Sequence, residues 1–117
     1  MRINEIRYSD AVPVEGYGPG FFRVGGEVHS GAILMAGGAA SGWGGLEDSA
    51  ALLALAGDVD VLFVGMGVDI AHLPGDLRTR LEAAGLGVEV MNSPAACRTY
   101  NVLLSEGRRV ALAALPV

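Results

Sequence analysis

The chain has 117 residues, of which 51% are hydrophobic and 18% are charged, and its formal net charge is −5. This length favours one domain, and the apolar content is too high for a disordered tail. The acidic balance argues against binding to nucleic acid, which needs Lys and Arg to displace phosphate counterions. We therefore expect no nucleic-acid partner.

The same sequence indicates where the protein resides. No apolar run reaches the roughly 18 residues that a membrane-spanning helix needs, so we expect no membrane insertion. Residues 1–10 are charged and lack the apolar core of a signal peptide. The single cysteine, Cys97, has no partner for an internal disulfide, which favours a reducing, cytoplasmic setting. One Cys and two His are too few for a Cys/His zinc site, so we expect neither metal nor cofactor.

The first third of the chain has the pattern of β-strands. Strands are expected over Phe21–Val24, Glu27–Ser30 and residues 31–36. The first two flank Gly25 and Gly26, which supply the positive φ that a tight hairpin turn needs. Residues 16–20 are expected to form a turn, and residues 37–45 an ordered glycine-rich loop anchored by Trp43.

After this loop, helix and strand patterns alternate. Helices are expected over residues 46–56, 75–84 and 94–106, and strands over residues 59–64, Gly87–Met91 and residues 109–115. In the first helix Leu46, Ala50 and Leu53 are expected to share the buried face. In the second helix that face is expected to hold Leu77 and Leu81, and Ser93 is expected to cap the third. The pattern predicts a single three-layer α/β domain over residues 1–117, with a mixed central sheet, flanking helices and an N-terminal β excursion.

Two segments follow strands that should end at the same edge of this sheet. One is the glycine turn after residues 59–64, and the other is the start of the last predicted helix. Ligands in α/β sheets bind beyond the carboxyl ends of the strands. Free N–H groups at a helix start favour an anion, and Arg98 adds a planar cation. The predicted ligand-binding residues are Gly65, Met66, Gly67, Asn92, Ser93, Cys97, Arg98 and Asn101. The structural alternative is a tight turn followed by ordinary helix capping.

Cys97 is also a candidate nucleophile, because a helix N-terminus can lower the pKa of a thiol. A cysteine nucleophile needs a base, and the candidates are His29 on an early strand and His72 in the loop after Gly67. A lone Cys beside Ala95 and Ala96 is more often a small buried apolar residue. The sequence also does not force two carboxylates into one cleft. We therefore assign no catalytic residue.

Four aromatic residues fall between positions 17 and 43: Tyr17, Phe21, Phe22 and Trp43. Aromatic side chains anchor protein interfaces, so this group favours a partner-facing patch. Side chains alternate along a strand, and only one of Phe21 and Phe22 can therefore face the core. The other is exposed or covered by a second layer or a partner.

One segment of the chain is distinctive. Residues 95–103, followed by Glu106, Gly107 and Arg108, resemble the signature of a small domain-of-unknown-function family. That family includes the mitochondrial respiratory complex I assembly factor three and an adipogenesis-associated human protein. Further matching pieces are residues 62–67 and 73–81. The resemblance implies a compact three-layer α/β fold, no settled enzyme activity and no agreed catalytic residues. The resemblance also implies a role with protein partners. The chain itself resembles the bacterial members of the family.

Two functions follow from these observations. The first is a non-enzymatic interaction or assembly module that works with an unidentified protein partner. An apolar sheet edge would also allow a homodimer. The second is a binding protein or enzyme for a small anionic metabolite. Its pocket walls would be the Gly65–Gly67 turn and the helix start from Ser93 to Arg98.

Overall fold

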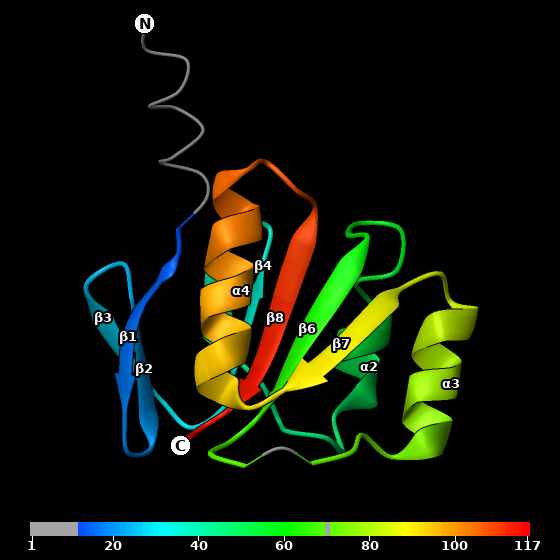
Figure 1. Ribbon diagram of the computed structural model, residues 1–117, viewed down its shortest axis with the longest axis horizontal. Coiled ribbons are helices and arrows are strands. Elements are labelled where there is room, and N and C mark those ends of the chain that lie inside the picture. The colour runs from blue at the N-terminus through cyan, green and yellow to red at the C-terminus, as the bar shows by residue number, and fades with distance from the viewer. Residues whose placement is uncertain (1–11, 70) are drawn as a thin grey trace, which may run out of the picture.

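The computed structural model describes residues 12–69 and 71–117 (Figure 1). Residues 1–10, for which the sequence predicts no signal peptide, lie outside this range. The strands are β1 (Val14–Gly18), β2 (Phe21–Val24), β3 (Glu27–Ser30), β4 (Ile33–Ala36), β5 (Ala39–Gly42), β6 (Val61–Met66), β7 (Gly87–Met91) and β8 (Val110–Leu115). The helices are α2 (Ser49–Leu53), α3 (Gly75–Ala83) and α4 (Ser93–Ser105). None of these helices is long and apolar enough to cross a membrane.

The strands form two sheets within the described residues. The smaller sheet is antiparallel with the order β1-β2-β3, and the larger has the order β5-β4-β8-β6-β7. In the larger sheet β6 runs parallel to β7 and β8, whereas β4 is antiparallel to β8. The carboxyl ends of β6, β7 and β8 therefore meet at one edge. The predicted mixed α/β fold with an N-terminal β excursion is confirmed.

The larger sheet separates two apolar cores. On one face α4 and the small sheet cover Phe63, Leu112 and Met35, and on the other α2 and α3 cover Leu62 and Val64 (Figure 1). The strand β8 is buried over nearly its whole length because successive side chains point into opposite cores. A strand covered on both faces needs apolar residues at every position, and the sequence of β8 meets that need.

The strand predictions for the first third were incomplete. The strands β2, β3 and β4 lie where they are expected, with Gly25 and Gly26 at positive φ in the turn. The strands β1 and β5 fall in segments predicted as a turn and a loop. Both contain glycine, which weakens a strand signal, and both are held by pairing to a neighbour. In β1 the ring of Phe21 covers Gly18, where a Cβ would come within 2.5 Å of it.

The glycine-rich stretch is ordered by Trp43, as predicted. The indole is buried, and its Nε1 donates to the carbonyl of Asp48 at 3.3 Å. The Trp43 amide donates to the carbonyl of Ala32 at 3.0 Å. This anchor fixes the connection between β5 and α2, although part of the stretch forms a strand.

The helices correct two sequence predictions. The helix α2 begins only at Ser49, so Leu46 precedes it; Ala50 is exposed, and Leu52 and Leu55 are buried instead. The predicted buried face of that helix was wrong at Ala50. In α3 the predicted Leu77 and Leu81 are buried.

The cap of α4 also differs from the expected one. Asn92, not Ser93, caps the helix, and its Oδ1 accepts a hydrogen bond from the Ala95 amide at 2.8 Å. Both residue types cap helices well, so the choice between them depends on what else the Ser93 side chain contacts.

Candidate functional site

Ser93 joins the carboxyl ends of the three parallel strands. Its side chain is fully buried, and its Oγ accepts a hydrogen bond from the Gly67 amide at 2.9 Å. The same hydroxyl donates to the carbonyl of Leu115 at 2.6 Å. The Ser93 amide donates to the carbonyl of Gly67 at 2.8 Å. We call Gly65, Gly67, Ser93 and Leu115 the Ser93 junction.

The two glycines of this junction have separate structural reasons. A Cβ at Gly65 would lie 2.7 Å from Ser93 Oγ and 2.8 Å from Ser93 Cα, so the close approach of β6 to α4 requires glycine. Gly67 has a φ of +85°, which only glycine adopts readily in the turn after β6. The structure therefore brings the glycine turn and the helix start together, in direct contact.

The N–H groups at the start of α4 are already engaged. The Ser93 amide bonds Gly67, Pro94 has no N–H, and the Ala95 amide bonds the Asn92 side chain. The Ala96 amide donates to the Asn92 carbonyl at 2.9 Å. The sequence predicts that an anion would bind the backbone N–H groups and Arg98 at this helix start. Of these donors, the Arg98 guanidinium is the one left exposed. Binding of an anion here stays a prediction.

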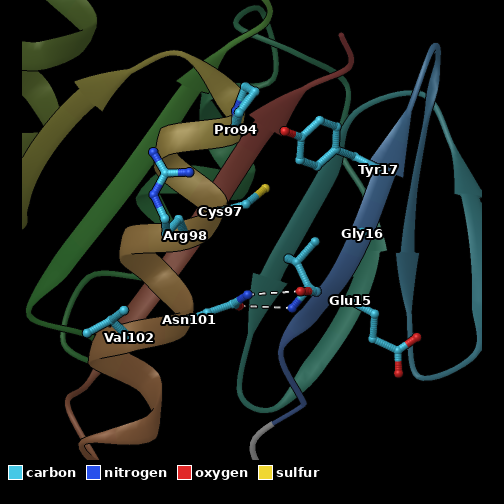
Figure 2. Close-up of a pocket in the computed structure, with 9 residues that line it drawn as sticks. Glu15, Gly16, Tyr17, Pro94, Cys97, Arg98, Asn101 and Val102 are labelled. Carbon is cyan, nitrogen blue, oxygen red and sulfur yellow. Dashed lines mark hydrogen bonds between the residues drawn. The ribbon is translucent and has the colours of Figure 1, made fainter.

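Asn101 fastens the small sheet to α4. Its Nδ2 donates to the carbonyl of Val14 at 2.8 Å, and the Val14 amide donates to its Oδ1 at 2.9 Å (Figure 2). The side-chain amide thus occupies both hydrogen-bonding groups of a strand residue, as a neighbouring strand would. Asn101 therefore attaches β1 to α4 through two hydrogen bonds between residues that are 87 positions apart in the sequence.

Replacing Asn101 with Ala should loosen the small sheet. Two hydrogen bonds are lost, which we expect to lower the free energy of unfolding by about 1–3 kcal/mol. Asn101→Asp puts a carboxylate oxygen against the Val14 carbonyl in place of the donor, so at neutral pH it should lower the free energy of unfolding at least as much as Asn101→Ala. Hydrogen exchange of the Val14 amide measures the effect directly. Unchanged protection of that amide in Asn101→Ala would show that other contacts hold β1.

Cys97 is buried between α4 and the small sheet. The side chain is 4% exposed, and burial raises the pKa of its thiol to about 11. Burial likewise raises the pKa of Tyr100 to about 12. His72 lies exposed in the loop after β6 and does not line the groove beside Cys97. Among the residues described, no group of three or more His, Cys, Asp or Glu is placed to hold a metal ion.

These raised pKa values predict the response of Cys97 to alkylation and pH. We expect iodoacetamide to modify the unfolded chain readily at pH 7.5 and the folded chain only slowly, because the folded thiol stays protonated and covered. A raised folded pKa favours the folded state below the unfolded pKa of about 8.5, and that contribution is lost as pH rises towards 11.

Urea unfolding at pH 8 and pH 10.5 measures this loss. Cys97→Ala is the control, and it should lose less stability over the same interval than the wild type loses. Rapid alkylation of the native protein at pH 7.5 would contradict a buried thiol.

A groove of about 270 Å³ runs between α4 and β1 (Figure 2). The α4 wall consists of Pro94, Cys97, Arg98, Asn101 and Val102. The β1 wall consists of Val14, Glu15, Gly16 and Tyr17. Of the predicted site residues, Cys97, Arg98 and Asn101 line this groove, whereas Gly65, Met66, Gly67, Asn92 and Ser93 do not. Sequence reasoning missed the β1 wall because it missed β1.

The four aromatic residues do not form one patch. Phe22 is fully buried, and Phe21 is half-buried over Gly18, so the prediction that only one of them faces the core is confirmed. Trp43 belongs to the core on the opposite face of the larger sheet. Tyr17 is 46% exposed, and its ring points across the groove towards α4 (Figure 2). Tyr17 is therefore the one of these four aromatic residues that is exposed along the groove.

Known proteins resemble the chain over all or most of its length. An uncharacterised protein of Rhodobacter capsulatus is 55% identical over 117 residues, which are 100% of this chain and 94% of that protein. The crystal structure of an outer membrane protein from Bartonella henselae matches with a TM-score of 0.84 and 33% identity. That match covers 93% of this chain and 98% of that one.

A more distant relative has a role in its name. The NADH dehydrogenase [ubiquinone] 1 alpha subcomplex assembly factor 3 of Danio rerio is 38% identical over 58 residues, which are 50% of this chain and 33% of that protein. Residues 14–115 match the family described as a protein of unknown function (DUF498/DUF598), and this range takes in both sheets, the Ser93 junction and the groove. The chain belongs to the DUF498/DUF598 family.

Proposed function

We propose that the chain is a non-enzymatic interaction or assembly module that acts through a protein partner in the bacterial cytoplasm. The observation that carries this proposal is the similarity to the complex I assembly factor of Danio rerio. The aligned segment is a third of that protein, so the proposal carries over a general role in assembly and not that protein's own target.

The contacts of the polar side chains support a non-enzymatic role. Ser93, Asn92 and Asn101 each bond the backbone and thereby hold the fold. The buried thiol of Cys97 stays protonated at neutral pH, because its pKa is raised to about 11. A nucleophile needs the thiolate form, which this environment disfavours. The groove between α4 and β1 instead presents exposed apolar surface, which suits recognition better than chemistry.

Capture of the tagged 117-residue chain from native lysate tests the proposal. With a short crosslinker, we expect one protein to be retained reproducibly and in near-stoichiometric amount. The control is the same tag on an unrelated domain of similar charge. Recovery of the chain alone, with and without crosslinker, would contradict an interaction module. Recovery of a crosslinked homodimer alone would mean that the partner is a second copy of the chain.

The complex I relationship needs a separate measurement. Loss of the chain should cause partly assembled NADH dehydrogenase to accumulate, seen as smaller bands on blue native gels. Re-expression should restore the mature complex. If a partner is captured but NADH dehydrogenase assembly is unchanged, the chain is an interaction module without a role in complex I assembly.

The metabolite alternative has a simple thermal test. Because the amides at the start of α4 are engaged, we expect millimolar inorganic phosphate to leave the melting temperature unchanged. A ligand that binds the native state would raise it by mass action. A rise that disappears in Arg98→Ala would favour the anion-binding alternative over the interaction module.

A further inference from the structure

We infer that the groove between α4 and β1 is the docking site for an extended peptide segment of a protein partner. The segment places an apolar side chain in the groove and a carboxylate on Arg98. This inference rests on the proposed function, since it names the surface through which the module would act.

The length and openness of the groove favour an extended chain. Along α4 it runs from Pro94 to Val102, which is about 12 Å at the helical rise of 1.5 Å per residue. About four residues of extended peptide span that distance. The two walls come from separate elements, and their rims are exposed, with Tyr17 at 46% and Val102 at 51%. A peptide can lie along such a groove, whereas a small molecule would keep much of its surface in water.

The apolar character of the groove predicts what enters it. Among the described residues, the exposed large hydrophobic side chains are Tyr17, Val28, Val68 and Val102. Two of the four, Tyr17 from β1 and Val102 from α4, are among the residues that line this groove. Pro94 on the α4 wall adds further apolar surface. Exposed apolar surface gathered in a concave site favours an apolar anchor from a partner.

The charges around the groove predict an acidic partner residue. On the β1 wall the Glu15 carboxylate accepts a hydrogen bond from the Gly26 amide at 3.0 Å and points away from α4 (Figure 2). On the α4 wall Arg98 is exposed, and the ion pairs among the described residues engage other arginines. Among the described residues, neither the Arg98 guanidinium nor the Tyr17 hydroxyl donates a hydrogen bond. Both are suited to a carboxylate, which a guanidinium can bind through two parallel hydrogen bonds.

The backbone of β1 limits how the peptide binds. Peptides often extend a sheet by pairing with the backbone of an edge strand. At Val14 both backbone groups are taken by the Asn101 side chain, so a peptide cannot pair with β1 there. Recognition at this end of the groove therefore depends on side chains, which makes Arg98 decisive for affinity.

Two peptide pools test the inference on the isotope-labelled 117-residue chain. The probes are blocked tetrapeptides with one position fixed as Glu and the others apolar, and the same pool with Gln at that position. The Glu pool should shift the NMR signals of Tyr17, Arg98 and Val102, and the Gln pool should bind about tenfold more weakly. Arg98→Gln should weaken binding of the Glu pool by a similar factor. The control is Arg108→Gln, an exposed arginine outside the groove, which should leave binding unchanged.

Several results would overturn the inference. These are equal responses to the two pools, an undiminished response in Arg98→Gln, or shifts confined to other surfaces. N-acetyl-leucine producing the same shifts at the same concentration would indicate a site for small carboxylates. Shifts of the groove signals with protein concentration alone would indicate a second copy as the occupant.

The outcome separates this inference from the proposed function. If Arg98→Gln still captures the partner from lysate and the peptide pools do not bind, the interaction module stands and the surface is wrong. If the wild type captures no partner, the proposed function fails, whatever the peptides do.

Discussion

Replacement of Gly65 with Ala is expected to be among the most destabilising single-methyl changes in this protein. The added Cβ would lie 2.7 Å from Ser93 Oγ and 2.8 Å from Ser93 Cα, and the second of these atoms is backbone that cannot rotate away. Inserting a methyl group into such a packed contact costs about 3 kcal/mol. Urea unfolding should show a lower free energy of unfolding for Gly65→Ala by about that amount.

Gly42→Ala is the matched control for this experiment. Gly42 also lies in a strand, its φ is not positive, and no atom within 4 Å would meet its Cβ. We expect a change of less than about 0.5 kcal/mol there. Equal stabilities for Gly65→Ala and Gly42→Ala would mean that β6 and α4 are not in the close contact described.

Ser93→Ala should have the second large effect. The change removes the hydroxyl that accepts from the Gly67 amide and donates to the carbonyl of Leu115, so two groups of the Ser93 junction lose their partner. Leaving buried backbone groups unsatisfied costs about 2–4 kcal/mol for the pair. The free energy of unfolding should fall accordingly, and hydrogen exchange of the Gly67 amide should become faster.

Ser105→Ala provides the comparison for Ser93→Ala. Ser105 lies at the other end of the same helix, and its hydroxyl donates to the carbonyl of Val102 in an exposed position. Its loss should cost less than about 0.5 kcal/mol. An equally small cost for Ser93→Ala would show that the hydroxyl does not join the strand ends.

The architecture could largely be predicted because local patterns and packing agree over most of the chain. The apolar run in β8 and the pair Leu77 and Leu81 in α3 are patterns that the core directly requires. The strands β1 and β5 could not be predicted, since their glycine-containing sequences become strands only through pairing with β2 and β4. Both pairings close short hairpins, with turns at Pro19-Gly20 and Gly37-Gly38, and the glycines and small residues around these turns give little apolar alternation to mark the strands.

The candidate site was partly predictable for a related reason. Chain order predicts that the Gly65–Gly67 turn and the helix start lie at one sheet edge. It does not predict how closely the two segments contact each other. The Ser93 hydroxyl bonds Gly67 and Leu115, and this contact between distant segments explains why Asn92 is the cap. Similarly, the sequence predicts Asn101 as a ligand-binding residue, but both polar atoms of its side chain bond the backbone of Val14. The predicted segment thus contains a structural junction at Ser93 and a groove at Arg98.

Site-specific photocrosslinking tests most directly whether function lies at this groove. A photoreactive phenylalanine analogue would replace Val102 on the groove or Val68, which is 65% exposed and does not line it. Irradiation in native cells should crosslink a discrete protein to the chain labelled at position 102 and leave the chain labelled at position 68 free. The crosslink should weaken when Arg98→Gln is added and persist with Arg108→Gln. Equal crosslinking from both positions, or none from position 102, would contradict a partner bound along α4 and β1.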